Sequence, residues 1–182
     1  MTARSQWRVN AGALAPRGRR GEDDRVELLD GEIVVMTPIG RRHSSGVDRL
    51  NRFFARGVGE RAIVRVQSPI RLGPYAEPQP DLSLLKPRDD FYAQADAGPE
   101  DVLLVVEVAE ASARYDRQVK IPAYARSRIP EAWLVDLPGE GIEIYRDPGP
   151  DGYREVRRLR RGERVAPQAF PDLVLSVGDA LA

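Results

Sequence analysis

Two acidic residues beside apolar segments are the first features of this sequence that could do chemistry. Glu107 directly follows the apolar run at residues 102–106, and Asp81 opens the segment Asp-Leu-Ser-Leu-Leu at residues 81–85. An ionised carboxylate in a hydrophobic sheet is costly to desolvate unless it is paired, protonated or bound to a cation. If these segments are neighbouring strands, their carboxylates require a compensating cation. Oxygen ligands favour a hard divalent ion such as magnesium or manganese.

Lys120 supplies a third candidate group, and it is one of only two lysines in the chain. A helix that starts near residue 113 would bring Lys120 back by about 10 Å, roughly level with Glu107. There its ammonium group could hold an attacking water or neutralise charge on a phosphorane-like transition state.

Each of the three residues also has a structural interpretation that these observations leave open. Glu107 could form a salt bridge with one of the many arginines, and Asp81 could be an ordinary strand-start aspartate after Pro80. Lys120 could form an i, i+4 pair with Asp116 on a solvated helix face.

Composition excludes several other kinds of site. The 182 residues include no cysteine and one histidine, His43, which rules out thiol nucleophiles, disulfides, iron–sulfur clusters and cysteine-based zinc sites. A serine hydrolase that uses His43 is a poor interpretation, because the chain has no Gly-x-Ser-x-Gly elbow. The 28 basic and 28 acidic residues cancel, so nucleic-acid binding would depend on a local patch. The arginines from Arg154 to Arg164 are one candidate, with a solvated strand and turn as the default.

The elements that must position these residues form a mixed α/β (α+β) pattern, a β-sheet with a few helices, in one domain at residues 25–182. Residues 1–24 lack periodicity and are expected to form a loosely ordered arm. Because Asp-Gly favours a type I′ turn, a hairpin is expected around Asp30 and Gly31. The other expected elements are a helix at 41–58, strands at 62–72 (bent or interrupted at Pro69) and 81–85, a surface excursion at 86–101, a strand at 101–108, a helix at 113–127, a strand at 132–137, a hairpin at 141–159 and a short strand at 173–176.

Two features of this pattern bear on the surroundings of Glu107. The apolar run before it is typical of a strand covered on both faces, and strand–helix–strand order predicts that 101–108 and 132–137 pair in parallel. Ser112 is expected to cap the following helix, and Pro122 is expected to kink that helix or displace its start.

The aromatic residues Phe53, Phe54, Tyr124 and Trp133 are expected to pack the core. With no membrane-length apolar window and no signal-peptide core, the expected location is cytoplasmic.

Several spaced motifs occur in order from about Arg25 to the C-terminus. They are Val26-Glu-Leu-Leu-Asp-Gly-Glu-Ile33, His43-Ser44, Pro80-Asp81, Val105-Val-Glu-Val108, Ser112 with Tyr115-Asp-Arg and Lys120, Tyr124-Ala-Arg, and Ile129-Pro-Glu-Ala-Trp-Leu-Val-Asp136. Together they resemble the Uma-two family of bacterial endonucleases with the PD-(D/E)xK fold. The resemblance implies a restriction-endonuclease-like mixed β-sheet core flanked by helices, with N-terminal and C-terminal β-hairpins.

The resemblance also implies roles for individual residues. Asp81 and Glu107 would hold Mg²⁺ or Mn²⁺, assisted by the peptide carbonyl of Val108. Lys120 would be the catalytic lysine, and Glu27 matches a helper acid. His43 and Ser112 are candidate substrate contacts, although a structural histidine at a helix N-terminus is at least as well supported.

The sequence departs from the basic family pattern at one position. Ala109 stands two residues after the glutamate, where the pattern has a lysine, and Lys120 on the next helix is the family's usual substitute. Glu110 adds a further negative charge near the proposed site, with a surface position as its alternative.

Two functions remain in competition. The first is a metal-dependent endonuclease acting on nucleic acid, with DNA as the expected substrate and a homodimer expected for duplex cleavage. The alternative is a catalytically inactive nucleic-acid- or protein-binding member of the same fold. It is motivated by the neutral net charge, the lack of a separate DNA-reading module and the displaced lysine.

Overall fold

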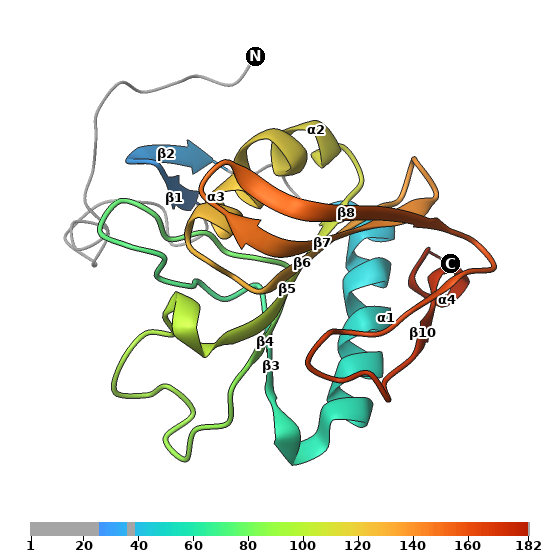
Figure 1. Ribbon diagram of the computed structural model, residues 1–182, viewed down its shortest axis with the longest axis horizontal. Coiled ribbons are helices and arrows are strands. Elements are labelled where there is room, and N and C mark those ends of the chain that lie inside the picture. The colour runs from blue at the N-terminus through green and yellow to red at the C-terminus, as the bar shows by residue number, and fades with distance from the viewer. Residues whose placement is uncertain (1–25, 36–38, 182) are drawn as a thin grey trace.

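The structure is a computed structural model that describes residues 26–35 and 39–181 (Figure 1). The expected arm at residues 1–24 lies outside the described residues. A six-stranded sheet has the strand order β3-β4-β5-β6-β7-β8. Its strands are β3 (Ile63–Val66), β4 (Leu82–Leu85), β5 (Val102–Ala109), β6 (Glu131–Asp136), β7 (Gly141–Gly149) and β8 (Gly152–Arg160). The mixed fold expected from the sequence is confirmed.

The parallel pair predicted from the element order is β5 with β6, where Glu107 lies opposite Leu134. All the other neighbouring strands of this sheet pair antiparallel. The crossover between β5 and β6 consists of α2 (Ala113–Tyr115), the π-helical turn η4 (Asp116–Lys120) and α3 (Ile121–Arg126). Asp81 immediately precedes β4, so β4 and β5 bring both acidic residues to adjacent strands.

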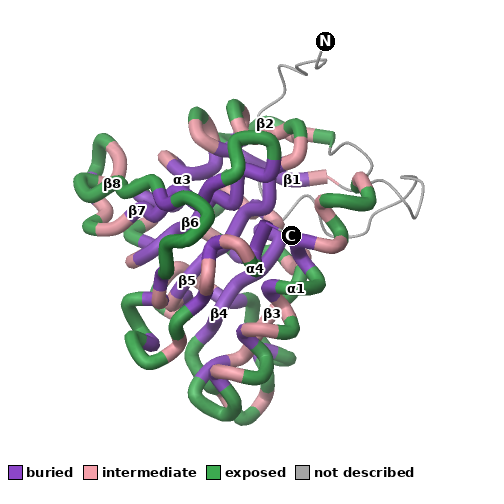
Figure 2. The backbone as a smooth tube through the Cα atoms, turned by 90° about the vertical axis from the view of Figure 1, so that its right-hand side faces the viewer, coloured by how far each residue is buried: buried purple, intermediate pink, exposed green. Residues whose placement is uncertain are grey.

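Helices cover both faces of the sheet. The predicted helix at 41–58 is α1 (Arg41–Val58), and its residues Leu50 and Phe54 pack in one core cluster with Val106. On the other face, Tyr124 of α3 packs in a second cluster with Val105. Because side chains alternate along a strand, Glu107 points to the face covered by α3, whereas Val106 and Val108 point toward α1. Figure 2 shows that the central strands are mostly buried, whereas exposed residues lie in the loops and along β8.

The predicted hairpin at the start of the domain is β1 (Val26–Leu29) and β2 (Glu32–Val35), which pair antiparallel. Its turn has φ of 51° at Asp30 and 81° at Gly31, the positive values that a type I′ turn requires. Leu28 exchanges backbone hydrogen bonds with Glu77, so the hairpin is attached to the loop that precedes β4.

The crossover helix differs from the expected single helix at 113–127. Ile121 donates its backbone N–H to the Asp116 carbonyl, a π-type bond that makes the middle turn wider than an α-turn. Pro122 explains the change, because its ring would collide with a carbonyl four residues earlier in a regular α-helix. Ser112 stands at the N-terminal boundary, but its hydroxyl makes no capping bond and donates to Asp116 instead.

Three other boundaries differ from expectation. The strand expected at 62–72 ends at Val66, because Gln67 adopts a left-handed φ of 48°. The excursion at 86–101 contains the 3₁₀ turn η3 (Pro99–Asp101) and contributes Tyr92 and Ala97 to the core. Strands β7 and β8 extend into the turn expected to separate them.

The remaining elements lie at the ends of α1 and of the chain. They are the 3₁₀ turn η2 (Gly59–Arg61), the paired short strands β9 (Arg164–Val165) and β10 (Leu175–Ser176), and the helix α4 (Val177–Leu181). Within the described part of the chain, no helix is both long and apolar enough to cross a membrane.

Candidate active site

Four of the expected site residues are buried, and three of them, Glu27, Glu107 and Lys120, contact one another on the α3 face of the sheet. Glu27 comes from β1, Asp81 precedes β4, Glu107 lies on β5 and Lys120 ends the π-helical turn. These four residues are between 2% and 5% exposed. Ionisable groups with so little solvent must be neutralised by one another, by protons or by a bound cation.

Lys120 connects two of the carboxylates. Its Nζ lies 2.9 Å from Glu27 Oε1 and 2.8 Å from Glu107 Oε1. Burial alone would lower the pKa of Lys120, but the charges of Glu107, Glu27 and Asp116 outweigh burial and raise that pKa above its usual value. Lys120 is therefore a cation at neutral pH. The alternative i, i+4 pair with Asp116 is not among the ion pairs of the described residues.

Glu107 is held by two donors at the same oxygen. Besides Lys120, the hydroxyl of Tyr124 donates to Glu107 Oε1 over 2.5 Å. Burial raises the pKa of Glu107 well above its usual value; Lys120 opposes this shift, and repulsion from Asp116 and Asp81 adds to it. A single ammonium group cannot neutralise this set of carboxylates, so the site has an affinity for protons or for a further cation.

Asp81 is oriented by three donors. Its Oδ2 lies 2.9 Å from His43 Nε2 and accepts the Val108 N–H over 2.9 Å, and its Oδ1 accepts from Gln67 over 3.2 Å. Burial alone would raise the pKa of Asp81, but the hydrogen bond and charge of His43 and the Val108 N–H bring it below its usual value. An ionised carboxylate can only accept, so His43 carries a proton on Nε2.

His43 and Val108 therefore contact Asp81 in ways that the sequence did not specify. The ring of His43 contacts the carboxylate of Asp81. Val108 contacts the same carboxylate through its backbone N–H and not through its carbonyl. A substrate contact by His43 and a metal contact by the Val108 carbonyl stay predictions.

Asp116 and Ser112 form a pair beside the site. Ser112 Oγ donates to Asp116 Oδ2 over 2.6 Å. Burial raises the pKa of Asp116 to about 6, although Lys120 and the Ser112 hydroxyl oppose the shift. Ser112 is thus directed at a carboxylate, and its contact with substrate also stays a prediction.

The structure adds residues that sequence reasoning missed. Tyr124 was expected only to pack the core; it is fully buried, and it also bonds Glu107. Its spacing of four residues from Lys120 places both on one helix face, a signal present in the sequence. Gln79 donates its backbone N–H to Glu27 over 2.7 Å, a contact across 52 residues that no local pattern encodes.

Ala109 occupies the position of the family-pattern lysine. It is fully buried in the second core cluster, which also contains Ile121 and Tyr124 of the crossover helix. Glu110 is part-buried, and its carboxylate accepts the His43 backbone N–H over 3.4 Å at the start of α1.

The donor set fits an oxygen-ligated hard cation in composition. The buried cluster contains more carboxylates than lysines, and the chain contains no cysteine. No group of three or more His, Asp or Glu side chains with metal-binding geometry occurs within the described residues. An ion here would depend on two carboxylates completed by backbone oxygen and water, as magnesium sites commonly are.

The sheet, its two helical layers and this buried site define a mixed α/β protein with a nuclease-like fold. A crystal structure from Anabaena variabilis ATCC 29413, described as "a putative nuclease belonging to DUF820", has a TM-score of 0.73 to this chain at 17% identity. The match covers 90% of this chain and 93% of that chain, and at such identity it shows the fold alone.

The family assignment comes from the sequence. The profile of the Uma2 family, described as "Putative restriction endonuclease", matches residues 13–178. The chain belongs to the Uma2 family, which confirms the resemblance found in its motifs. No match was found among the curated proteins.

Proposed function

We propose that this protein is a metal-dependent endonuclease that hydrolyses phosphodiester bonds in nucleic acid, with DNA as the expected substrate. The observation that carries the proposal is the buried contact of Lys120 with Glu27 and Glu107 beside the ionised Asp81. Membership of a family described as restriction endonucleases supports the same reaction class.

Asp81, Glu107 and the Val108 carbonyl are the groups proposed to hold Mg²⁺ or Mn²⁺. Such an ion would polarise the scissile phosphate and stabilise the negative charge that develops in the transition state. The excess of buried carboxylates over lysine supports this assignment, because the cluster needs more positive charge than Lys120 provides.

The chain's own residues have distinct tasks in this proposal. Lys120 stabilises negative charge on the reacting phosphate and orients the attacking water. Glu27 and Tyr124 hold Lys120 and Glu107 in place, since each contacts one of them directly. His43 and the Val108 N–H fix the orientation of Asp81.

The second candidate is a binding protein that retains the fold without catalysis. The observation that favours it is the closure of the site, because all four site residues are at most 5% exposed and three of them are joined by ion pairs. A substrate phosphate would have to displace part of this network to reach Lys120.

A plasmid-nicking assay with Mg²⁺ or Mn²⁺ separates the two functions. We expect wild-type protein to cleave, and Glu107→Gln and Lys120→Ala to lose about 100-fold or more in rate. Glu155→Gln and Lys86→Ala are matched controls on exposed positions and should cleave as wild type does.

Three results would contradict the proposal. Metal-dependent cleavage that survives in both site variants would place the active centre elsewhere. Wild-type protein that binds no Mn²⁺ in calorimetry and cleaves neither DNA nor RNA would support the binding-only function. Cleavage that is unaffected by EDTA would exclude the metal.

A duplex nuclease needs two sites for two strands, so a homodimer is expected in light scattering.

A further inference from the structure

Five arginines lie along the exposed face of α1 and are called here the α1 arginine stripe. They are Arg41, Arg42, Arg49, Arg52 and Arg56, and all five are exposed. At 3.6 residues per turn they fall within an arc of about 100° around the helix axis. From the first to the last the stripe is about 22 Å long, at 1.5 Å per residue.

The charge of this stripe is not compensated within the described residues. None of its five arginines forms an ion pair there, and their one side-chain hydrogen bond is the 3.4 Å contact of Arg49 with Ser45. Asp48 is the only acidic residue of α1, so five arginines less one aspartate leave four positive charges on one helix.

Among the arginines from Arg154 to Arg164, which the sequence suggested as a basic patch, Arg154, Arg158 and Arg161 form ion pairs. Arg154 pairs with Asp147 at 3.2 Å and Arg161 with Glu140 at 3.4 Å. Arg158 lies 3.7 Å from Asp136. Arg157, Arg160 and Arg164 form no ion pair within the described residues, but strand alternation places Arg157 and Arg160 on opposite faces of β8. The larger set of unpaired arginines on one face is therefore the α1 arginine stripe.

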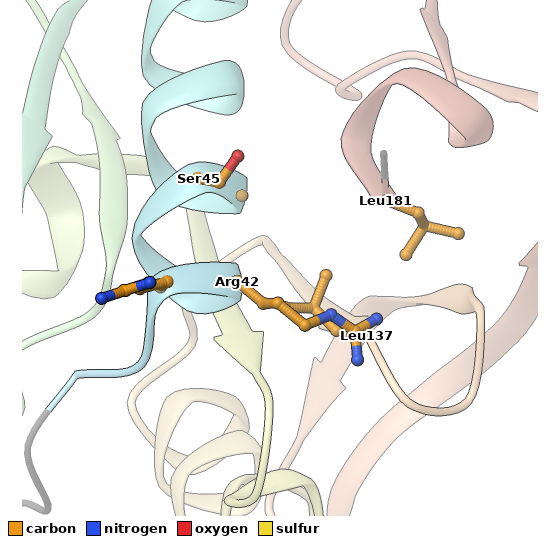
Figure 3. A pocket seen from close by; sticks show the side chains of 6 residues that line it. Arg42, Ser45, Leu137 and Leu181 are labelled. Atoms are coloured by element: carbon orange, nitrogen blue, oxygen red, sulfur yellow. The ribbon is translucent and has the colours of Figure 1, made fainter.

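The N-terminal end of the stripe lies beside His43 in the first turn of α1, although the histidine projects from the opposite side of the helix. His43, in the first turn of α1 between the first arginines and the rest of the stripe, reaches Asp81 with its ring. At the same end, Arg42 and Ser45 face Leu137 and Leu181 across a pocket of about 180 Å³ (Figure 3). None of the four candidate site residues lines this pocket, so its arginines belong to the surface beside the site.

We infer that the α1 arginine stripe is the surface that binds the phosphate backbone of the nucleic-acid substrate. The inference rests on the proposed function for the nature of the partner. Guanidinium groups bind phosphate oxygens in bidentate fashion, and unpaired ones are free to do so. A length of about 22 Å matches about six base pairs at 3.4 Å each.

The test is binding rather than cleavage, measured in EDTA by fluorescence anisotropy with labelled DNA and RNA at several salt concentrations. The triple variant Arg49→Gln, Arg52→Gln, Arg56→Gln leaves Arg41, Arg42 and His43 unchanged. We expect it to bind at least about tenfold more weakly and to lower the slope of log affinity against log salt by about 2 to 3. Glutamine has nearly the helix propensity of arginine, so thermal melting should not change.

The matched control removes the same charge from β8 and β9, with Arg157→Gln, Arg160→Gln and Arg164→Gln, all exposed positions. It should keep most of the affinity and the salt slope. Equal losses in the two triple variants, an α1 variant that binds as wild type does, or a wild type that binds neither nucleic acid would each overturn the inference. Binding through α1 without cleavage would contradict only the proposed function, and cleavage with binding that ignores α1 would contradict only the inference.

Discussion

Asp116 shows how the balance of charge around Lys120 affects single residues. It is 4% exposed, and the bond from Ser112 is the one side-chain hydrogen bond that it makes among the described residues. Burial raises its pKa from 3.8 to about 6. A carboxyl group with a raised folded-state pKa binds its proton more tightly when folded. Its contribution to stability is complete below the unfolded pKa and is lost as pH rises through about 6.

Asp116→Asn should therefore stabilise the metal-free protein above pH 6 and have little effect near pH 4. The gain at pH 7.5 is expected to be about 3 kcal/mol at most, since one pKa unit corresponds to about 1.4 kcal/mol. Urea unfolding of both proteins in EDTA from pH 4 to 8 measures the difference. A variant no more stable than wild type at pH 7.5 would show that Asp116 ionises without cost.

At the scale of elements, the β1–β2 hairpin supplies Glu27 to a site built otherwise by the sheet and the crossover helix. Its position depends on the turn at Asp30 and Gly31 and on the backbone bonds between Leu28 and Glu77. Gly31 also donates its N–H to the Tyr75 carbonyl over 2.8 Å. A change in the turn should therefore alter the geometry of the ion pair between Glu27 and Lys120.

Gly31→Ala should destabilise the protein by about 1 to 2 kcal/mol, because a side chain at a left-handed φ of 81° collides with the backbone. Gly73→Ala is the matched control: its φ is ordinary and a new Cβ would meet nothing within 4 Å. Urea unfolding of the two variants gives the comparison. If Gly73→Ala costs as much as Gly31→Ala, the turn is not what holds the hairpin.

At the scale of the whole molecule, the excess of buried carboxylates should link folding to cation binding. A ligand that binds only the folded state stabilises it by about 2.7 kcal/mol at a concentration of 100 Kd. For a chain of this length, that gain corresponds to a rise in Tm of roughly 5 to 10 °C.

Mn²⁺ should therefore raise the Tm of wild-type protein and leave that of Asp81→Asn nearly unchanged. Asp151→Asn, an exposed substitution in the β7–β8 turn, is the control and should respond to Mn²⁺ as wild type does. Differential scanning fluorimetry with and without Mn²⁺ gives the three shifts. An equal rise in wild type and Asp81→Asn would mean that the ion binds at another place.

Much of the fold could be predicted because its signals are local. The Asp-Gly turn, the helix at 41–58 and the parallel pairing of β5 with β6 each follow from a short pattern or from the order of elements. The strand expected at 62–72 was wrong beyond Val66, since the left-handed backbone at Gln67 has no signal in a glutamine. The π-helical turn was foreseen only as a disturbance at Pro122.

By itself, the sequence determined the residue types of the candidate site: two acids bordering apolar strands, one lysine on the next helix, and no thiol. Only the tertiary structure decided which atoms meet. Lys120 contacts Glu27 across 93 residues, and His43 contacts Asp81 across 38. The lack of ion pairs at the α1 arginines likewise became apparent only from the contacts of the described residues. Strand periodicity and turn chemistry act over a few residues, whereas contacts between charged side chains depend on packing that brings distant segments together.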